Sequence, residues 1–175
     1  WVFRTGISAN RLAQEGRRET WEETVDRYMK FITDERGEKI PTKVVRKIKE
    51  KILNHEVMPS MRAVWAAGEA GKESNVALYN CAYADIDSVD SFSEMLYILM
   101  CGAGVGFSVE LKNINKLPVV PKFLPSNSVI TIEDSKYGWA DSVKQLMNSL
   151  YSGHDINFNY NNIRGAGERL KTMGG

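Results

Sequence analysis

An amphipathic segment that leads through a glycine cluster into a β-prone segment constrains the fold of this chain most. Over 92–100, apolar residues recur at the three- and four-residue spacing of a helix. Gly102 is expected to end this helix, because glycine tolerates the left-handed backbone of a helix terminus. We expect a turn over Gly102–Gly106 and a strand over Phe107–Leu111. A helix followed at once by a strand favours an α/β or α+β fold.

Capping signals indicate where two helices begin. Glu23 follows Thr20 by three residues, the spacing at which side chain and backbone satisfy each other's hydrogen bonds at a helix start. An apolar stripe from Trp21 to Ile32 marks the buried face of this helix. Asp87 or Asp90 is expected to cap the later helix that precedes the glycine cluster.

Weaker signals indicate the remaining elements, and no internal repeat is found. Pro41 suits a first helical position, and the apolar residues over 44–53 mark a helix whose opposite, basic face is interpreted as solvent-exposed rather than as a phosphate-binding patch. Another helix is expected over 139–151, with Gly153 as its stop. Elsewhere the periodicity fails, and only short extended pieces are expected, at 77–79, 81–83 and 129–132.

The composition excludes several classes of function. The 23 Lys and Arg residues balance 22 Asp and Glu residues, so the chain lacks the positive field typical of non-specific nucleic-acid binding. The sequence contains no run of 18 apolar residues that could span a membrane. Two cysteines are too few for a disulfide framework and indicate a reducing compartment. We therefore expect a soluble, cytoplasmic protein.

The residues by themselves leave the chemistry open. The glycine cluster has G-x-G-x-G spacing between a helix and a strand, which is neither a dinucleotide fingerprint nor a P-loop. A tight packing turn is therefore favoured there over a ligand loop. His55 and His154 lack ligand spacing, so no metal site is expected. By default, Cys81 and Cys101 are interpreted as small buried hydrophobic residues.

Six motifs occur in a characteristic order and cover nearly the whole chain. They fall within Gly16–Tyr28, Met58–Arg62, Tyr79–Cys81, Leu99–Glu110, Glu133–Asp141 and Ile163–Gly175. Together they resemble the adenosylcobalamin-dependent (class II) ribonucleotide reductases, in particular the monomeric ribonucleoside-triphosphate reductases. Gly165 departs from this family, in which proline is expected.

The resemblance implies an α/β fold made from the N-terminal portion of such an enzyme. Residues 1–57 would form N-terminal helices, and 58–175 would form the first part of a ten-stranded α/β barrel with a connecting or inserted segment. The chain is too short for the whole barrel. By the resemblance, the radical-bearing cysteine, the second reducing cysteine and most of the adenosylcobalamin site lie outside it. We therefore expect the chain alone to be inactive.

The implied reaction is reduction of the ribose 2′-hydroxyl of a ribonucleoside triphosphate by a thiyl-radical mechanism. The implied partners are a deoxynucleotide effector and thioredoxin or a similar dithiol. The resemblance makes Cys81 one of the two thiols that deliver electrons, whereas Cys101 is still interpreted as a packing residue. The resemblance also reverses the interpretation of the glycine cluster, which would then be a loop that closes over substrate phosphates. The implied substrate-binding residues are Met58, Pro59, Ser60, Asn80, Gly102 and Gly104.

A second hypothesis comes from a different class of protein. The chain could be a stand-alone, non-catalytic nucleotide-binding or interaction module derived from that N-terminal region. A reading frame that continues into further barrel strands with further active-site cysteines would distinguish the enzyme from the module.

Overall fold

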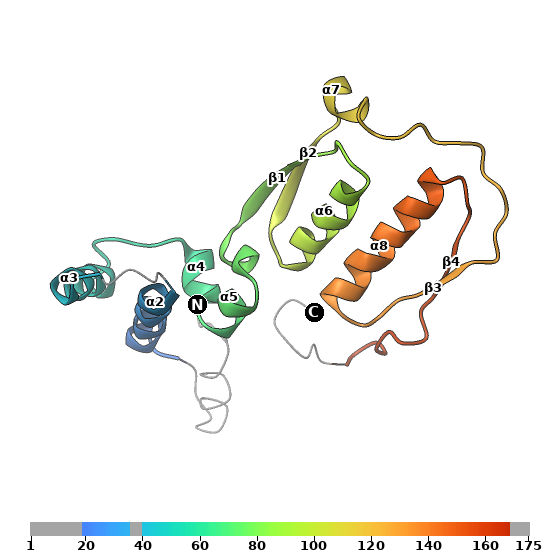
Figure 1. Cartoon of the computed structure of the whole chain (residues 1–175). Helices are drawn as coiled ribbons and strands as arrows, with labels where there is room; N and C mark the ends of the chain where they lie inside the picture. Colours follow the sequence, from blue (N-terminus) through green and yellow to red (C-terminus); the bar gives the residue numbers. More distant parts are fainter. Residues whose placement is uncertain (1–18, 36–39, 169–175) are drawn as a thin grey trace. The chain divides into compact units, whose positions relative to one another are not determined.

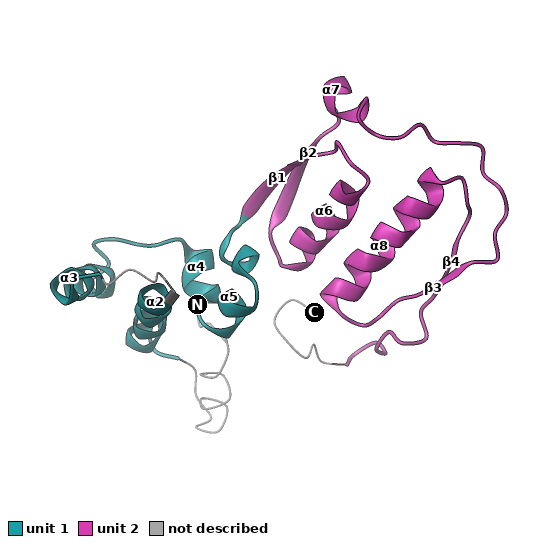
Figure 2. Ribbon diagram, in the orientation of Figure 1, with its two compact units in different colours: residues 1–80 teal, residues 81–175 magenta. Residues whose placement is uncertain are grey.

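The computed structural model describes residues 19–35 and 40–168 of the 175-residue chain. The chain divides into two compact units, Trp1–Asn80 and Cys81–Gly175 (Figure 2). The domain boundary that the family resemblance implies, between residues 57 and 58, stays a prediction. Within the described ranges, no helix is both long enough and apolar enough to cross a membrane.

Helices make up the described part of the first unit (Figure 1). They are α2 (Trp21–Glu35), α3 (Thr42–Leu53), α4 (Met61–Ala66), α5 (Glu69–Glu73) and the 3₁₀ helix η1 (Asn75–Leu78). The two expected helices are confirmed, although Pro41 is the N-cap of α3 rather than its first residue. The hydrophobic pattern does not predict helices α4 and α5, because they are too short to display a helical period.

The strand expected at 77–79 is wrong. The backbone closes 3₁₀ turns there, and the Tyr79 N–H donates to the Val76 carbonyl at 3.1 Å. Arg62 Nε donates to the Ala77 carbonyl at 2.8 Å, so a side chain takes the acceptor that a neighbouring strand would use. Local β-propensity at these residues is therefore overridden by a contact from α4.

The expected capping box begins α2, and the stripe behind it forms a small core with α3. The Thr20 N–H donates to Glu23 Oε2 at 2.8 Å, and the Glu23 N–H donates to Thr20 Oγ1 at 3.2 Å. Val25, Met29 and Ile52 are the buried members of the core. Partly buried apolar residues surround them: Trp21, Tyr28, Val45 and Leu53. The expected stripe of α3 is only partly buried, because Val44 and Ile48 remain exposed.

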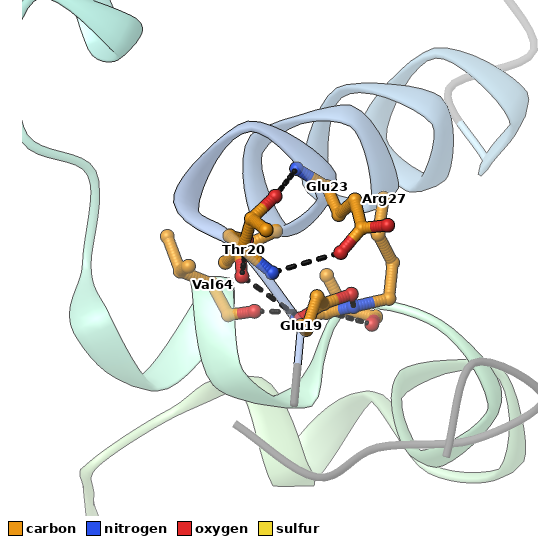
Figure 3. Close-up of polar contacts among 7 residues, drawn as sticks. Glu19, Thr20, Glu23, Arg27 and Val64 are labelled. Atoms are coloured by element: carbon orange, nitrogen blue, oxygen red, sulfur yellow. Dashed lines mark hydrogen bonds and ion pairs between the residues drawn. The ribbon is translucent and has the colours of Figure 1, made fainter. Parts of the chain in front are cut away.

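Arg27 of α2 forms a buried ion pair with Glu19 and also donates hydrogen bonds to the backbone of α4 (Figure 3). The Arg27 guanidinium contacts both carboxylate oxygens of Glu19 at 3.0 Å, and only 11% and 2% of the two side chains are exposed. Thr24 Oγ1 donates to the same carboxylate at 2.8 Å. Arg27 Nη1 also donates to the carbonyl oxygens of Val64 and Ala67. One guanidinium therefore holds Glu19, α2 and the end of α4 together.

The second unit contains two βαβ modules (Figure 1). Its elements are β1 (Cys81–Asp85), α6 (Asp90–Met100), β2 (Gly104–Ser108), α7 (Leu111–Ile114), β3 (Val129–Thr131), α8 (Lys136–Tyr151) and β4 (Asn157–Asn159). Strand β1 pairs in parallel with β2 through the crossover helix α6, and β3 pairs in parallel with β4 through α8. The two crossover helices pack against each other. The expected helices at 92–100 and 139–151 are confirmed, as are the extended pieces at 81–83 and 129–132.

The secondary structure of the glycine cluster differs from the turn expected over residues 102–106. Gly102 ends α6 with a φ of +86°, as expected, and Gly153 follows α8 with a φ of +79°. However, β2 already begins at Gly104, so Gly104–Ser108 is strand and the turn is shorter than expected. Leu111 begins α7 instead of ending a strand. The reason is tertiary, because pairing with β1 draws the glycines into the ladder and overrides their weak β-propensity.

The expected aspartate cap of α6 is wrong. Val89 is the N-cap residue and provides no side-chain hydrogen bond. Ser88 and Ser91 bond to each other there, at 3.0 Å between their Oγ atoms. Asp90 lies in the first turn and forms an ion pair with Lys144 of α8 at 2.9 Å. The Asp90 carboxylate therefore pairs with Lys144 of α8 and does not cap α6.

Arg27→Gln is expected to lower the free energy of unfolding by about 3–5 kcal/mol, because the Glu19 carboxylate would stay buried without its counter-charge. Urea unfolding of the full chain, followed by circular dichroism, measures this. The matched control is Lys49→Gln, which breaks the exposed pair between Lys49 and Asp26 and should cost no more than about 1 kcal/mol. Equal losses in the two variants would contradict the role given to Arg27.

Gly138→Ala is expected to destabilise the second unit although alanine normally improves a helix by about 1 kcal/mol. A Cβ at Gly138 would lie 2.5 Å from the Glu133 carbonyl oxygen, so the backbone must shift, at a cost of about 1–3 kcal/mol. In the control Gly106→Ala, the new Cβ would lie 3.7 Å from Tyr83 Cδ2, an ordinary contact. Thermal unfolding should separate the two variants, and a melting temperature raised by Gly138→Ala would refute the clash.

Candidate functional site

Cys81 is the first residue of β1, and its thiol is free and exposed. Cys101, at the C-cap of α6, is only 5% exposed. The default interpretation as a buried hydrophobic residue is therefore right for Cys101 and wrong for Cys81. The physical reason is that Cys81 lies on the uncovered face of a two-stranded sheet, whereas Cys101 closes the helix that packs on that sheet.

The register of β1 and β2 determines what surrounds the thiol. Cys81 is opposite Gly104, and Tyr83 is opposite Gly106. Because side chains alternate along a strand, these four residues share one face of the sheet. Gly104 and Gly106 contribute no side chains, so the floor beside the thiol is backbone. Such a floor lets a ligand approach the sheet closely.

The Tyr83 ring borders this floor. A Cβ built on Gly106 would lie 3.7 Å from Tyr83 Cδ2, so the ring reaches the position of the missing side chain. The Tyr83 side chain is itself exposed. The face thus presents a thiol and an aromatic ring beside bare backbone, an arrangement suited to a flat or ring-shaped substrate.

Gly102 is expected to bind substrate, but its backbone N–H is not available for a ligand. Its N–H donates to the Leu99 carbonyl at 2.9 Å and closes the last turn of α6. That amide is therefore already engaged. The contribution left to Gly102 is its left-handed backbone, which turns the chain from α6 into β2.

The other residues expected in the site belong to the first unit. Met58 and Ser60 are exposed, and Pro59 between them is half-buried. Ser60 is the N-cap of α4, where its Oγ accepts from the Ala63 N–H at 3.4 Å, and its own O–H remains a donor. Asn80 is exposed at the last position of this unit.

Two acid–base pairs recur at equivalent positions of the βαβ modules and were not singled out from the sequence. After β1, Asp87 pairs with Lys116 at 3.0 Å, and after β3, Asp134 pairs with Arg164 at 2.8 Å. Each aspartate precedes a serine and the crossover helix, and each basic residue follows the second strand. The Asp-Ser pairs at 87–88 and 134–135 are the sequence signal that could have identified this repeat. Arg164 Nη1 is buried and has no hydrogen-bond partner among the described residues.

The described residues do not form a site that fits a metal or a corrinoid cofactor. They contain no group of three or more His, Cys, Asp or Glu side chains that could hold a metal ion. The apolar groove between α6 and α8, about 520 Å³ in volume, is much smaller than a corrin ring with its side chains and nucleotide would need. No chemical step is therefore assigned to a cofactor held by these residues.

Curated relatives match most of this chain, whereas no family model matches it. An adenosylcobalamin-dependent ribonucleoside-triphosphate reductase of Euglena gracilis is 31% identical over 71% of the chain and 18% of its own length. A probable enzyme of the same name from Dictyostelium discoideum is 27% identical over 99% of the chain and 27% of its own length. One described as putative, from Mycobacterium phage D29, is 26% identical over 95% and 29%. The chain therefore spans less than a third of the length of these relatives.

The fold also matches a solved structure. A crystal structure of a B12-dependent (class II) ribonucleotide reductase is 21% identical, with a TM-score of 0.75 over 93% of this chain and 32% of that one. The described elements form a mixed helix and strand fold with two small parallel sheets, and a ten-stranded barrel is not formed within them. The expected resemblance is thus confirmed, and over most of its length this chain is similar to a part of the adenosylcobalamin-dependent ribonucleoside-triphosphate reductases.

Proposed function

We propose that the chain is part of a ribonucleotide reductase that converts ribonucleoside triphosphates to 2′-deoxyribonucleotides in the cytoplasm. The named relatives support this proposal, and so does the position of Cys81 opposite Gly104 on an uncovered sheet face. The two parallel strand pairs would contribute to a ten-stranded α/β barrel, with the other strands supplied by the rest of a longer protein. Adenosylcobalamin, on which the relatives depend, would bind mainly outside the described residues.

Cys81 would supply one of the two thiols that reduce the substrate. Two thiols give up two electrons and two protons and become a disulfide, while the ribose 2′-hydroxyl leaves as water and a hydrogen takes its place. The thiol must therefore reach both the sugar and a second cysteine. An exposed thiol beside the bare backbone of Gly104 supports the first condition, because no side chain at that position blocks the approach of a furanose ring.

The other residues that the resemblance implies would bind the substrate. The segment of Met58, Pro59 and Ser60, together with Asn80, would offer hydroxyl, amide and backbone donors to phosphate oxygens. Gly104 would let the backbone close over the ligand, with Gly102 shaping the turn that precedes it. Thioredoxin or a similar dithiol would then reduce the disulfide, and a deoxynucleotide would act as effector.

Cys81 is expected to react with iodoacetamide at least about tenfold faster than Cys101 in the native 175-residue chain. Alkylation of Cys101 requires local opening, and an opening free energy of only about 1.4 kcal/mol already accounts for tenfold. Mass spectrometry of tryptic peptides measures both rates, and a Cys81→Ser variant checks that loss of one thiol does not expose the other. Equal rates in the folded chain would refute the difference in exposure.

The catalytic role is tested in a chimera in which this chain replaces the corresponding region of the Dictyostelium discoideum relative. With adenosylcobalamin and a dithiol, the chimera should reduce ribonucleoside triphosphates over many turnovers. Cys81→Ser should abolish multiple turnover and leave cobalamin binding intact, because this thiol supplies electrons and does not hold the cofactor.

The matched control is Cys101→Ser, which changes the other thiol and should retain turnover. An active Cys81→Ser chimera, with Cys101→Ser inactive, would show that the redox role belongs to the other cysteine. The isolated chain should produce no deoxynucleotide, and any turnover by it would contradict the placement of the radical cysteine outside the chain. A chimera that binds cobalamin but stays inactive would contradict the proposed function itself.

A further inference from the structure

The groove between α6 and α8 is, we propose, a binding site for a small organic polycation such as a polyamine. The groove has a volume of about 520 Å³ and lies within the second unit. Its walls combine aromatic, aliphatic and acidic side chains: Glu94, Tyr97, Ile98, Tyr137, Ala140 and Asp141. None of these residues belongs to the site proposed for ribonucleotide reduction, so the inference does not depend on that function.

Two tyrosines form the aromatic part of the groove. The ring centroids of Tyr97 and Tyr137 lie 5.2 Å apart at an interplanar angle of 32°, and the two hydroxyl groups are 3.2 Å apart. Tyr137 is 61% exposed although it lines the groove. Tyrosine faces attract ammonium groups through the quadrupole of the ring. Ile98 and Ala140 offer apolar contact to a methylene chain between such groups.

The charge around the groove is negative. Lys144 is the basic residue among its walls, and this ammonium is already paired with Asp90 at 2.9 Å. Glu94 forms no hydrogen bond with the described residues, and Asp141 accepts only from the neutral amide of Gln145, at 2.6 Å. The hydrogen bond that Lys144 donates to Asp90, followed by the nearby carboxylates of Asp141 and Glu94, raises the pKa of Lys144. The ammonium of Lys144, one of the groove's lining residues, is shared by the carboxylates of Asp90, Asp141 and Glu94, so negative charge is in excess there.

The arrangement of the carboxylates favours an extended organic cation over a metal ion. Asp90 and Glu94 are four residues apart on α6, about 5–6 Å between their Cβ atoms, and Asp141 faces them from α8. No three acidic, histidine or cysteine side chains among the described residues converge as a metal site requires. Spread charges with apolar and aromatic walls between them suit ammonium groups separated by methylenes.

The experiment titrates spermidine into the full 175-residue chain at 0.15 M NaCl and measures heat by calorimetry and tyrosine emission by fluorescence. Saturable binding with one site is expected. Glu94→Gln and Asp141→Asn should each weaken it about threefold, the effect of removing one exposed charge. Tyr137→Leu should weaken it further than Tyr137→Phe, which keeps the ring.

The matched control is Asp155→Asn, which removes one exposed carboxylate from the same unit outside the groove and should leave the affinity within twofold. Circular dichroism of each variant establishes that it is folded. Absence of saturable binding would overturn the proposal, as would equal weakening by Asp155→Asn and the groove variants, which signals general counter-ion attraction. Displacement of spermidine by MgCl₂ at equal ionic strength would overturn it in favour of a simple electrostatic surface.

Discussion

The parallel pairing of β1 with β2 is the constraint on which the second unit depends. Parallel strands cannot be joined by a tight hairpin, so the chain must cross over, and α6 is that crossover. The helix covers one face of the pair and leaves the other uncovered. Strand alternation then assigns Cys81 and Tyr83 to the uncovered face, and the register brings Gly104 and Gly106 beside them. A shift of one residue would turn the thiol toward the helix.

The first unit depends on a different kind of interaction. Val25, Met29 and Ile52 are the buried members of the apolar cluster between α2 and α3, and a polar contact links α2 to α4. Burying the Glu19–Arg27 pair costs desolvation free energy. The pair fixes the orientation of the segments that it contacts, because the donors of the guanidinium have set directions. The donors left over after Glu19 reach the carbonyl oxygens of Val64 and Ala67. The short helix α4, which follows the Met58–Ser60 segment, is thereby fixed to α2.

The second unit uses one structural solution twice. In each βαβ module an aspartate at the carboxyl end of the first strand pairs with a basic residue that follows the second strand. The carboxyl ends of parallel strands are where α/β proteins commonly bind ligands, because strand ends and helix amino ends meet there. The crossover helices also pack against each other, and residues of these two helices line the groove between them. The unit therefore presents three different surfaces. They are a sheet face with a thiol, strand ends with acid–base pairs, and a helix groove with aromatic and acidic side chains.

Local sequence patterns are enough to predict the long helices, the capping box at Thr20, the helix stops at Gly102 and Gly153, and the family resemblance. These features depend on local periodicity, backbone freedom or residue identity, which a linear sequence records. Contacts between distant segments make Gly104–Ser108 a strand and residues 77–79 a 3₁₀ turn. Such a contact also pairs Asp90 with a residue of another helix, so that it does not cap its own helix. The tertiary structure also determines that Cys81 is exposed and Cys101 buried. Each of these outcomes depends on which distant segment supplies the hydrogen bond, the charge or the covering face, and neighbours in the sequence do not contain that information.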